Sequence, residues 1–447
     1  MPGKGGRSSF PGRAVAEPLK RVRVAALDVE HARRWTTVLV GPLELPSRAE
    51  LLDRYTALAE HGNPARLSLQ PALESRRWRQ IPVQAARVIH AADAPPPGSP
   101  LTALLPQVRA LRDRDIDGGL RILCAGDQLA IDFCHGLGEV AFVHLILDVL
   151  LGAVDPADPD LLAAYRSRRS PVLRAALRTF GTSPHRVASV VKEYRDRATL
   201  QATAHRVDQA DAAPVRPFRP APTTRVVGLP AAAVAEIRRQ RDVHLPGVSL
   251  VALCTYALWE AFADTGPGVD DTVKIPFDVR RYLGAAPSTL GPFTAGLDYT
   301  LGAGGLARLQ AEMDRSARSG RPVANLLMGT LKARLHRQDA EDLHPARPRM
   351  RLLHSNVGWP PNSGRWPLTD PASAYMLVAS DPAGPEGITV TSAAMSGNLW
   401  LTAEFHGNVF DPERIDAALN TVGDRMYTMA SGRFDRRTQL LGCPGAQ

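Results

Sequence analysis

The sequence is poor in cysteine and has no long uninterrupted hydrophobic run. The first feature argues against a disulfide-rich protein, and the second argues against a membrane-spanning one. Four cysteines stand among 447 residues and form no CxxC pair, so we expect a reducing compartment and no disulfide framework. The longest apolar stretch, residues 140–154, is interrupted by His144 and Asp148 and is shorter than the about 20 residues that span a bilayer. The basic N-terminal segment lacks the apolar core of a secretory signal. Together these features predict a cytoplasmic protein without a membrane span.

Several catalytic and cofactor-binding motifs are also missing. The sequence contains no GxSxG, no GxxxxGK and no GxGxxG, so nothing in it indicates a nucleotide-binding loop or a dinucleotide-binding turn. We therefore expect no metal, no redox coenzyme and no tightly bound cofactor.

Basic residues are in excess and are concentrated in one stretch. The formal net charge is +9 and the sequence pI is about 9.7. Between residues 161 and 197, nine Lys or Arg residues are opposed only by Glu193 and Asp196. Such a surface favours acidic partners, although a solvated helix face has the same composition. Nucleic-acid binding is not expected, because the stretch has no recognisable module and no interleaved aromatic residues.

The composition and length predict a globular protein of two lobes. Apolar residues make up 44% and charged residues 22% of a chain that is too long for one small core. Strand-like and helix-like segments mix in both halves, without a repeat of fixed length. The predicted division is a disordered basic tail over 1–20, a first lobe over 21–200, a proline-rich linker over 201–224 and a second lobe over 225–440.

Residues 119–135 predict a β-hairpin that ends in a histidine. Two apolar runs flank a Gly-Asp pair at 126–127, which is a favourable two-residue turn. In this register Cys124 and Cys134 are not opposite each other, so a disulfide between them is not expected. The helix predicted over residues 139–151 is apolar nearly all round, which indicates that it is buried.

The position of His135 makes it a candidate general base. A side chain at the tip of a buried strand, just before a glycine turn, is held rigidly above the sheet, and the next helix N-terminus adds a positive field. A packed structural histidine is the alternative interpretation. A metal site formed by His135 and Glu139 is disfavoured, because the two glycines between them interrupt a helix. A nucleophilic Cys134 is disfavoured too, because strand alternation turns it away from His135.

Residues 134–140, CHGLGEV, resemble the HHxxxDG motif of the condensation-domain and acyltransferase superfamily that shares the chloramphenicol-acetyltransferase fold. In its plant and mycobacterial-type acyltransferases the motif is HxxxD. His135 matches the catalytic second histidine of the motif. The resemblance extends in the family's order over most of residues 25–430. The other similar segments are the opening strand and helix up to HGNPARL, then GVSLVALCTYALWEA, IPFDVRRYLG, SNVGW and SGNLWLTAEFHGNVFDPERI.

The resemblance implies an α/β fold, a pseudo-dimer of two lobes in which each sheet packs against helices in an α+β two-layer arrangement. A tunnel between the lobes would hold the histidine midway. His135 would take the proton of an acceptor as that acceptor attacks a thioester, which is general-base catalysis. Glu139 would pair with Arg280 and fix the histidine loop. Ser355 and Asn356 stand where the family lines its tunnel, and an asparagine that holds a turn is the equal alternative.

Three residues depart from the family's motif. Cys134 replaces the first histidine, and Glu139 is one methylene longer than the usual aspartate, so its pairing requires a shifted backbone. Val140 replaces a glycine, and a β-branched residue does not easily adopt positive φ. We therefore expect either a turn rebuilt on Gly136 and Gly138 or a partly closed site.

The resemblance implies acyl or aminoacyl transfer in secondary-metabolite, nonribosomal peptide or lipid biosynthesis. The donor would be a thioester on the phosphopantetheine arm of an acyl or peptidyl carrier protein, or an acyl-coenzyme A. The acceptor would be a small-molecule amine or alcohol, so the product is an amide or an ester. The alternative is a non-catalytic condensation-like module that docks a carrier protein or a tailoring enzyme.

Overall fold

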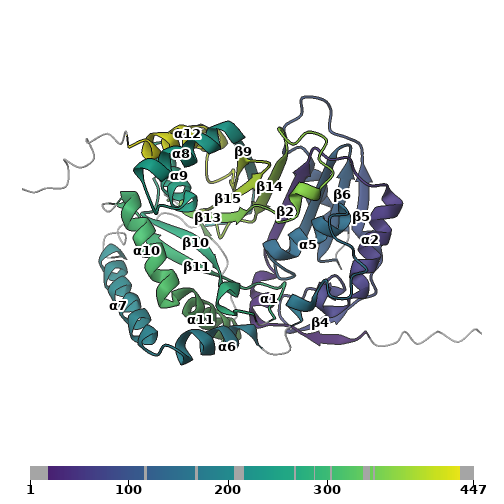
Figure 1. Cartoon of the computed structure of the whole chain (residues 1–447), viewed down its shortest axis with the longest axis horizontal. Helices are drawn as coiled ribbons and strands as arrows, with labels where there is room; N and C mark the ends of the chain where they lie inside the picture. The colour runs from purple at the N-terminus through teal and green to yellow at the C-terminus, as the bar shows by residue number, and fades with distance from the viewer. Residues whose placement is uncertain are drawn as a thin grey trace, which may run out of the picture.

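The fold was analysed in a computed structural model of the chain (Figure 1). The structure describes residues 19–114, 118–166, 170–205, 216–265, 268–285, 287–302, 305–335, 343–345 and 348–432. The predicted basic tail therefore lies almost wholly outside the described residues, as does Cys443. The three described cysteines, Cys124, Cys134 and Cys254, are free thiols.

The first lobe is built on a five-stranded sheet of order β14-β2-β7-β6-β5. The predicted hairpin forms its centre, with the Cα partners Cys124 and Leu129 in the predicted register. The strands are β2 (Trp35–Gly41), β5 (Ile89–Ala92), β6 (Leu120–Ala125), β7 (Gln128–Cys134) and β14 (Tyr375–Ser380).

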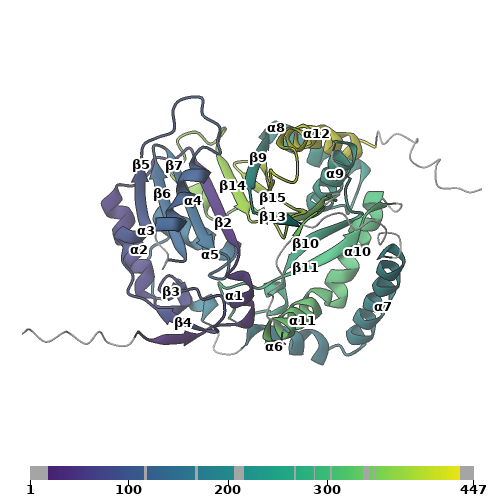
Figure 2. The same cartoon turned by 180° about the vertical axis from the view of Figure 1, so that it is seen from behind.

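Helices cover both faces of this sheet (Figures 1 and 2). Leu129, Ile131 and Phe133 of β7 pack into a core with α2 (Arg48–Glu60) and α5 (Val140–Leu150). Ala130, on the opposite face of β7, packs with α4 (Leu104–Arg114). The smaller elements of the lobe are β1 (Arg21–Arg23), α1 (Ala26–His31), η1 (Asn63–Ala65), β3 (Leu69–Gln70), β4 (Arg77–Gln80) and α3 (Ala85–Val88).

The second lobe is built on a six-stranded sheet of order β11-β10-β13-β15-β16-β9. Buried side chains of α8, α9 and α12 form one core with this sheet, because α9 is apolar on most of its surface. The strands are β9 (Pro222–Leu229), β10 (Thr272–Asp278), β11 (Thr294–Thr300), β13 (Arg351–Gly358), β15 (Gly387–Met395) and β16 (Asn398–His406). The helices are α8 (Ala231–His244), α9 (Leu250–Thr265), η4 (Val279–Tyr282), α10 (Gly305–Ser319), α11 (Arg321–Leu335), η6 (Ser363–Arg365) and α12 (Pro412–Ala430).

The division between the lobes differs from the predicted one at residue 200. Val172 and Ala175 of α6 pack with Val279 and Val323 of the second lobe, so the chain crosses before residue 171. Near its C-terminal end the chain returns to the first lobe, where β14 pairs antiparallel with β2. Sequence periodicity reports local structure only, which is why both crossings were missed. The crossing segments are η2 (Ala163–Tyr165), α6 (Pro171–Ala176), the π-helical turn η3 (Leu177–Gly181) and α7 (His185–His205).

The predicted linker over 201–224 is described only in part and stays a prediction. Helix α7 continues to His205, and β9 begins at Pro222, so both ends of the segment are regular structure. The short strand β8 (Arg216–Pro217) also lies within it and pairs with β12 (Leu343–His344). Pro217 stands in the short strand β8 and Pro222 begins β9, positions that tolerate a missing N–H. Residues 206–215 lie outside the described part. No described helix is both long and apolar enough to cross a bilayer.

Candidate active site

His135 lies at the junction of β7 and α5, as the sequence pattern predicts. Its backbone N–H donates to the Arg34 carbonyl at 2.8 Å, which extends the pairing of β7 with the chain before β2. After the three-residue turn 136–138, Glu139 is the N-cap of α5 and Val140 is its first helical residue. Strand pairing on one side and a helix start on the other therefore fix the backbone at His135.

The glycines of this turn allow close approach and do not supply positive φ. Neither Gly136 nor Gly138 is among the described residues with positive φ, and neither is Val140. A Cβ at Gly136 would lie 2.3 Å from the Asp28 carbonyl oxygen, and one at Gly138 would lie 2.3 Å from Cβ of Phe142. Val140 thus meets no backbone strain, because the turn needs no left-handed residue at that position.

Glu139 and Arg280 join the two lobes beside the histidine. Arg280 Nη1 donates to Glu139 Oε2 at 3.1 Å, and the side chains are 14% and 7% exposed. The other carboxylate oxygen of Glu139 accepts from the backbone N–H of Thr294 at 3.1 Å. The longer glutamate side chain reaches its partner from the N-cap position, in extended backbone conformation.

Arg280 is itself held by several groups of the second lobe. Its guanidinium donates to the carbonyls of Thr289 and Gly291, at 3.0 and 2.9 Å, and to Asp278 Oδ1 at 3.2 Å. Burial disfavours the charge, but Glu139 and Asp278 together raise the pKa of Arg280 above its usual value. A buried charge with this many partners is fixed in geometry.

Arg66 holds the same turn from the first lobe, and sequence reasoning missed it. Its Nε donates to the Leu137 carbonyl at 2.6 Å and its Nη2 to the Gly136 carbonyl at 2.9 Å. Asp28 of α1 lies 3.1 Å from the same Nη2. Arg66 has φ of 63°, a conformation that favours glycine, so the surrounding fold holds it there. The segment HGNPARL was matched to the family, but nothing in its pattern singles out Arg66.

His135 is partly exposed as a residue, while its Nδ1 is buried with no hydrogen-bond partner within the described structure. Nε2 is the ring nitrogen that we consider as the general base. Burial lowers the pKa of His135 below its usual value, with Glu139 acting in the opposite direction and Arg34 in the same direction. The ring is thus neutral near pH 7, as a general base must be.

Cys134 is a structural residue here. It is 1% exposed, and its Sγ donates to the Ala32 carbonyl at 3.3 Å. Burial raises the pKa of its thiol to about 11, so the nucleophilic thiolate is not populated near pH 7. Glu139 forms an ion pair with Arg280. No cluster of three or more potential metal ligands occurs among the described residues.

Ser355 and Asn356 lie on β13 of the second lobe. Asn356 Oδ1 and Ser392 Oγ are 3.0 Å apart, and Ser392 Oγ lies 3.0 Å from Nε2 of the fully buried His354. Nδ1 of His354 lies 2.6 Å from Thr255 Oγ1. A buried chain of polar groups thus reaches Asn356, which is exposed. In the part of the chain that the structure covers, no hydrogen bond joins Ser355 or Asn356 to His135.

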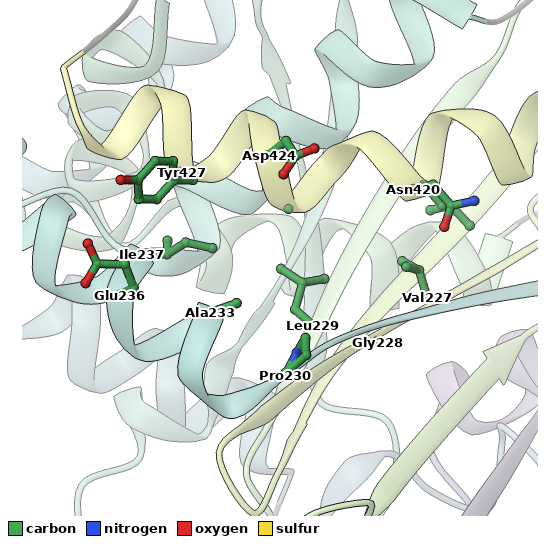
Figure 3. Close-up of a pocket in the computed structure, with 12 residues that line it drawn as sticks. Val227, Gly228, Leu229, Pro230, Ala233, Glu236, Ile237, Asn420, Asp424 and Tyr427 are labelled. Atoms are coloured by element: carbon green, nitrogen blue, oxygen red, sulfur yellow. The ribbon is translucent and has the colours of Figure 1, made fainter.

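Two pockets of the structure lie away from these residues. One, of about 370 Å³, is enclosed by α8, β9 and α12, with Leu229 and Ile237 in its lining and Glu236 and Asp424 among its polar groups (Figure 3). The other, of about 510 Å³, includes Gln128, which begins β7, whereas His135 follows its end. Neither pocket contains a predicted site residue.

Comparisons with known proteins identify the fold. No family model and no curated protein matches the sequence. The structure is similar to the epimerization domain from the third module of tyrocidine synthetase B, with a TM-score of 0.55 and 11% identity over 95% of this chain and 100% of that one. It is similar to the first condensation domain of the CDA synthetase, with a TM-score of 0.53 and 15% identity over 93% of this chain and 97% of that one.

A third similar structure is TRI3 trichothecene 15-O-acetyltransferase from Fusarium sporotrichioides, with a TM-score of 0.53 and 11% identity over 94% of this chain and 99% of that one. Epimerization, condensation and acetyl transfer are three different reactions, so the likeness establishes architecture and not chemistry. The chain therefore has the two-lobed α/β fold of these epimerization-domain, condensation-domain and acetyltransferase structures.

Proposed function

We propose that the protein transfers an acyl or aminoacyl group from a thioester to an amine or alcohol, with His135 as the general base. The observation that carries this proposal is the state of the His135 ring. The residue is partly exposed and its pKa is lowered by burial, so a neutral imidazole is available to accept a proton. The turn after it is held by Arg66, which binds two backbone carbonyls, and by Arg280 of the other lobe, which binds the Glu139 side chain.

The proposed reaction needs no group beyond the two substrates and this imidazole. The acceptor N–H or O–H gives its proton to His135 Nε2 while its lone pair forms a bond to the thioester carbonyl carbon. The tetrahedral intermediate then expels the thiolate, and the imidazolium returns the proton to that sulfur. The products are an amide or ester and a free thiol, and the histidine ends neutral.

A carrier protein or coenzyme A is the proposed source of the thioester. Both present a phosphopantetheine arm together with negative charge, and α6, η3 and α7 carry exposed Arg178 and Lys192. Exposed apolar side chains stand among them, including Leu173, Leu177 and Val187, which are 55%, 63% and 47% exposed. Mixed basic and apolar surface of this kind suits an acidic amphipathic partner. Ser355 and Asn356 are proposed to lie along the acceptor's path.

The test measures free thiol from a panel of acyl-pantetheine, acyl-coenzyme A and acyl-carrier thioesters, each with mixed amine and alcohol acceptors. The wild-type protein is compared with His135→Ala and with His244→Ala, which removes an exposed histidine at the end of α8. We expect acceptor-dependent release that only His135→Ala abolishes. Background release by all three proteins over the whole panel would overturn the proposal and favour a non-catalytic docking module.

A further inference from the structure

A second imidazole lies directly against the ring of His135. His31 is the last residue of α1, and the two ring centroids are 5.1 Å apart with the planes at 72°. In each ring Nδ1 is buried, and neither Nδ1 has a hydrogen-bond partner in the described structure. The reaction proposed above makes no use of His31.

The position of His31 is fixed by the contacts that hold the histidine turn. Asp28, on the same helix, pairs with Arg66, which binds the carbonyls of Gly136 and Leu137. The Ala32 carbonyl, one residue beyond His31, accepts from Cys134 Sγ. Helix α1 and the turn therefore form one unit, which keeps the backbones at His31 and His135 close together.

Two buried ring nitrogens without partners cost stability unless they hydrogen-bond to each other. A neutral imidazole carries one N–H and one lone pair, so one ring can donate from Nδ1 to the Nδ1 lone pair of the other. A general base at Nε2 of His135 requires its proton on Nδ1. His31 must then carry its own proton on Nε2 and accept at Nδ1. This is the tautomer pair that satisfies both buried atoms and leaves His135 Nε2 free.

The charged groups around the pair are engaged elsewhere. Glu139 binds Arg280 and the Thr294 N–H, and Asp381 Oδ2 accepts from the Trp35 N–H at 2.8 Å. Arg34 disfavours a positive charge on either ring. Burial lowers the pKa of His31 well below its usual value, and His135 lowers it further. His31 therefore remains neutral and keeps its lone pair when His135 is protonated.

We propose that His31 is a positioning residue whose Nδ1 accepts the Nδ1–H of His135 and so fixes the tautomer with a free Nε2. The two Nδ1 atoms are not hydrogen-bonded in the structure, so the proposed pairing requires the rings to rotate about their Cβ–Cγ bonds. When His135 takes the acceptor's proton at Nε2, its Nδ1–H is already paired, and no proton passes to His31. The tautomer assignment stands on its own, whereas the effect on turnover rests on the proposed function.

The test replaces His31 by Phe, which keeps a ring but removes both nitrogens, and by Gln, whose amide oxygen can accept. Nitrogen-15 NMR of the whole chain reports the tautomer and the pKa of His135 without any substrate. We expect the Nδ1–H tautomer in the wild type and in His31→Gln. In His31→Phe we expect a mixture of tautomers and a pKa of His135 that is about one unit lower. For any active donor and acceptor pair, kcat of His31→Phe should fall about tenfold at unchanged KM.

His144→Phe is the matched control, because His144 is also buried with an unpartnered Nε2 but lies in α5. It should leave the His135 resonances unchanged. If His31→Phe does not fold, His31→Met answers the same question. An unchanged tautomer and pKa in a folded His31→Phe or His31→Met would overturn the inference and leave His31 a packing residue. Absence of turnover in the wild type would contradict the proposed function, while the NMR result would still decide this one.

Discussion

Glu139 and Arg280 lie 141 residues apart in the chain, yet their carboxylate and guanidinium meet at 3.1 Å and tie the histidine turn of the first lobe to η4 of the second. Both are largely buried, and the Arg280 guanidinium also binds the carbonyls of Thr289 and Gly291 and the carboxylate of Asp278. The pair therefore couples the integrity of the site to the contact between the lobes.

Glu139→Ala should lower the free energy of unfolding by about 3–5 kcal/mol, because it leaves the Arg280 charge buried without its main partner. Urea denaturation measures the change. Glu236→Ala removes a carboxylate from a surface pair with Arg239 and should barely move the midpoint. Equal midpoints for the two variants would contradict the prediction.

Gly136→Ala should lower the free energy of unfolding by about 1–3 kcal/mol, because its Cβ would lie 2.3 Å from the backbone oxygen of Asp28. A backbone atom cannot move aside as a flexible side chain can. Thermal denaturation is the measurement, with Gly364→Ala as the control, since a Cβ at Gly364 meets nothing within 4 Å. Destabilisation of both variants alike would indicate a general cost of losing glycine.

Arg66→Lys should loosen the turn, because one ammonium cannot bind the carbonyls of Gly136 and Leu137 together with Asp28 in the fork geometry of a guanidinium. Hydrogen exchange at the backbone amides of residues 136–138 should accelerate about tenfold or more. Arg239→Lys on the surface of α8 serves as the control. Unchanged exchange in Arg66→Lys would mean that strand and helix alone hold the turn.

The stability of the protein should rise with pH between about 4 and 6.5. Burial lowers the pKa of both His144 and His354 to about 4, whereas the unfolded chain titrates near 6.5. Within this window the unfolded state binds more protons, so stability is lost as pH falls, by about 2–3 kcal/mol for each histidine. Urea midpoints over this range measure the slope, which His354→Gln should reduce and His244→Gln should not. An unchanged slope in His354→Gln would contradict the assignment.

Reversing the charges of Arg178 and Lys192 to Glu should raise KM for a carrier-linked or coenzyme A donor about tenfold at low salt, and less at high salt. KM for a short thioester without phosphates should stay the same. Arg238→Glu, an exposed change on α8, controls for overall charge. Equal KM values for the charged donor in all variants would exclude this surface from donor binding.

Local signals explain what the sequence predicted well. The turn at residues 126–127 and the buried helix that follows residue 139 depend on residues close together in sequence, and both are present. His135 was found because a strand, a glycine turn and a buried helix are adjacent in sequence. Arg280 was found only through the family resemblance.

The features that the sequence did not predict depend on distant segments. Arg66 and His31 reach the turn from about 70 and 100 residues away, and no spacing rule connects them to it. Asp132, on the centre of β7, is fully buried because Arg112 binds both of its oxygens, at 2.7 and 2.6 Å. A carboxylate in a strand of alternating polarity predicts that its side of the strand faces solvent. Asp132 is buried instead because Arg112 of helix α4 packs on that side.

The position of strand β14 late in the chain affects folding during translation. During translation, β2 leaves the ribosome long before residues 375–380 exist, so one edge of the first sheet stays open until most of the chain has been synthesised. A prematurely terminated product would keep that edge available to strands of other molecules. A fragment that ends between the lobes would therefore lack a strand of the first sheet. The shortest fragment that contains every strand of both sheets includes nearly the whole chain.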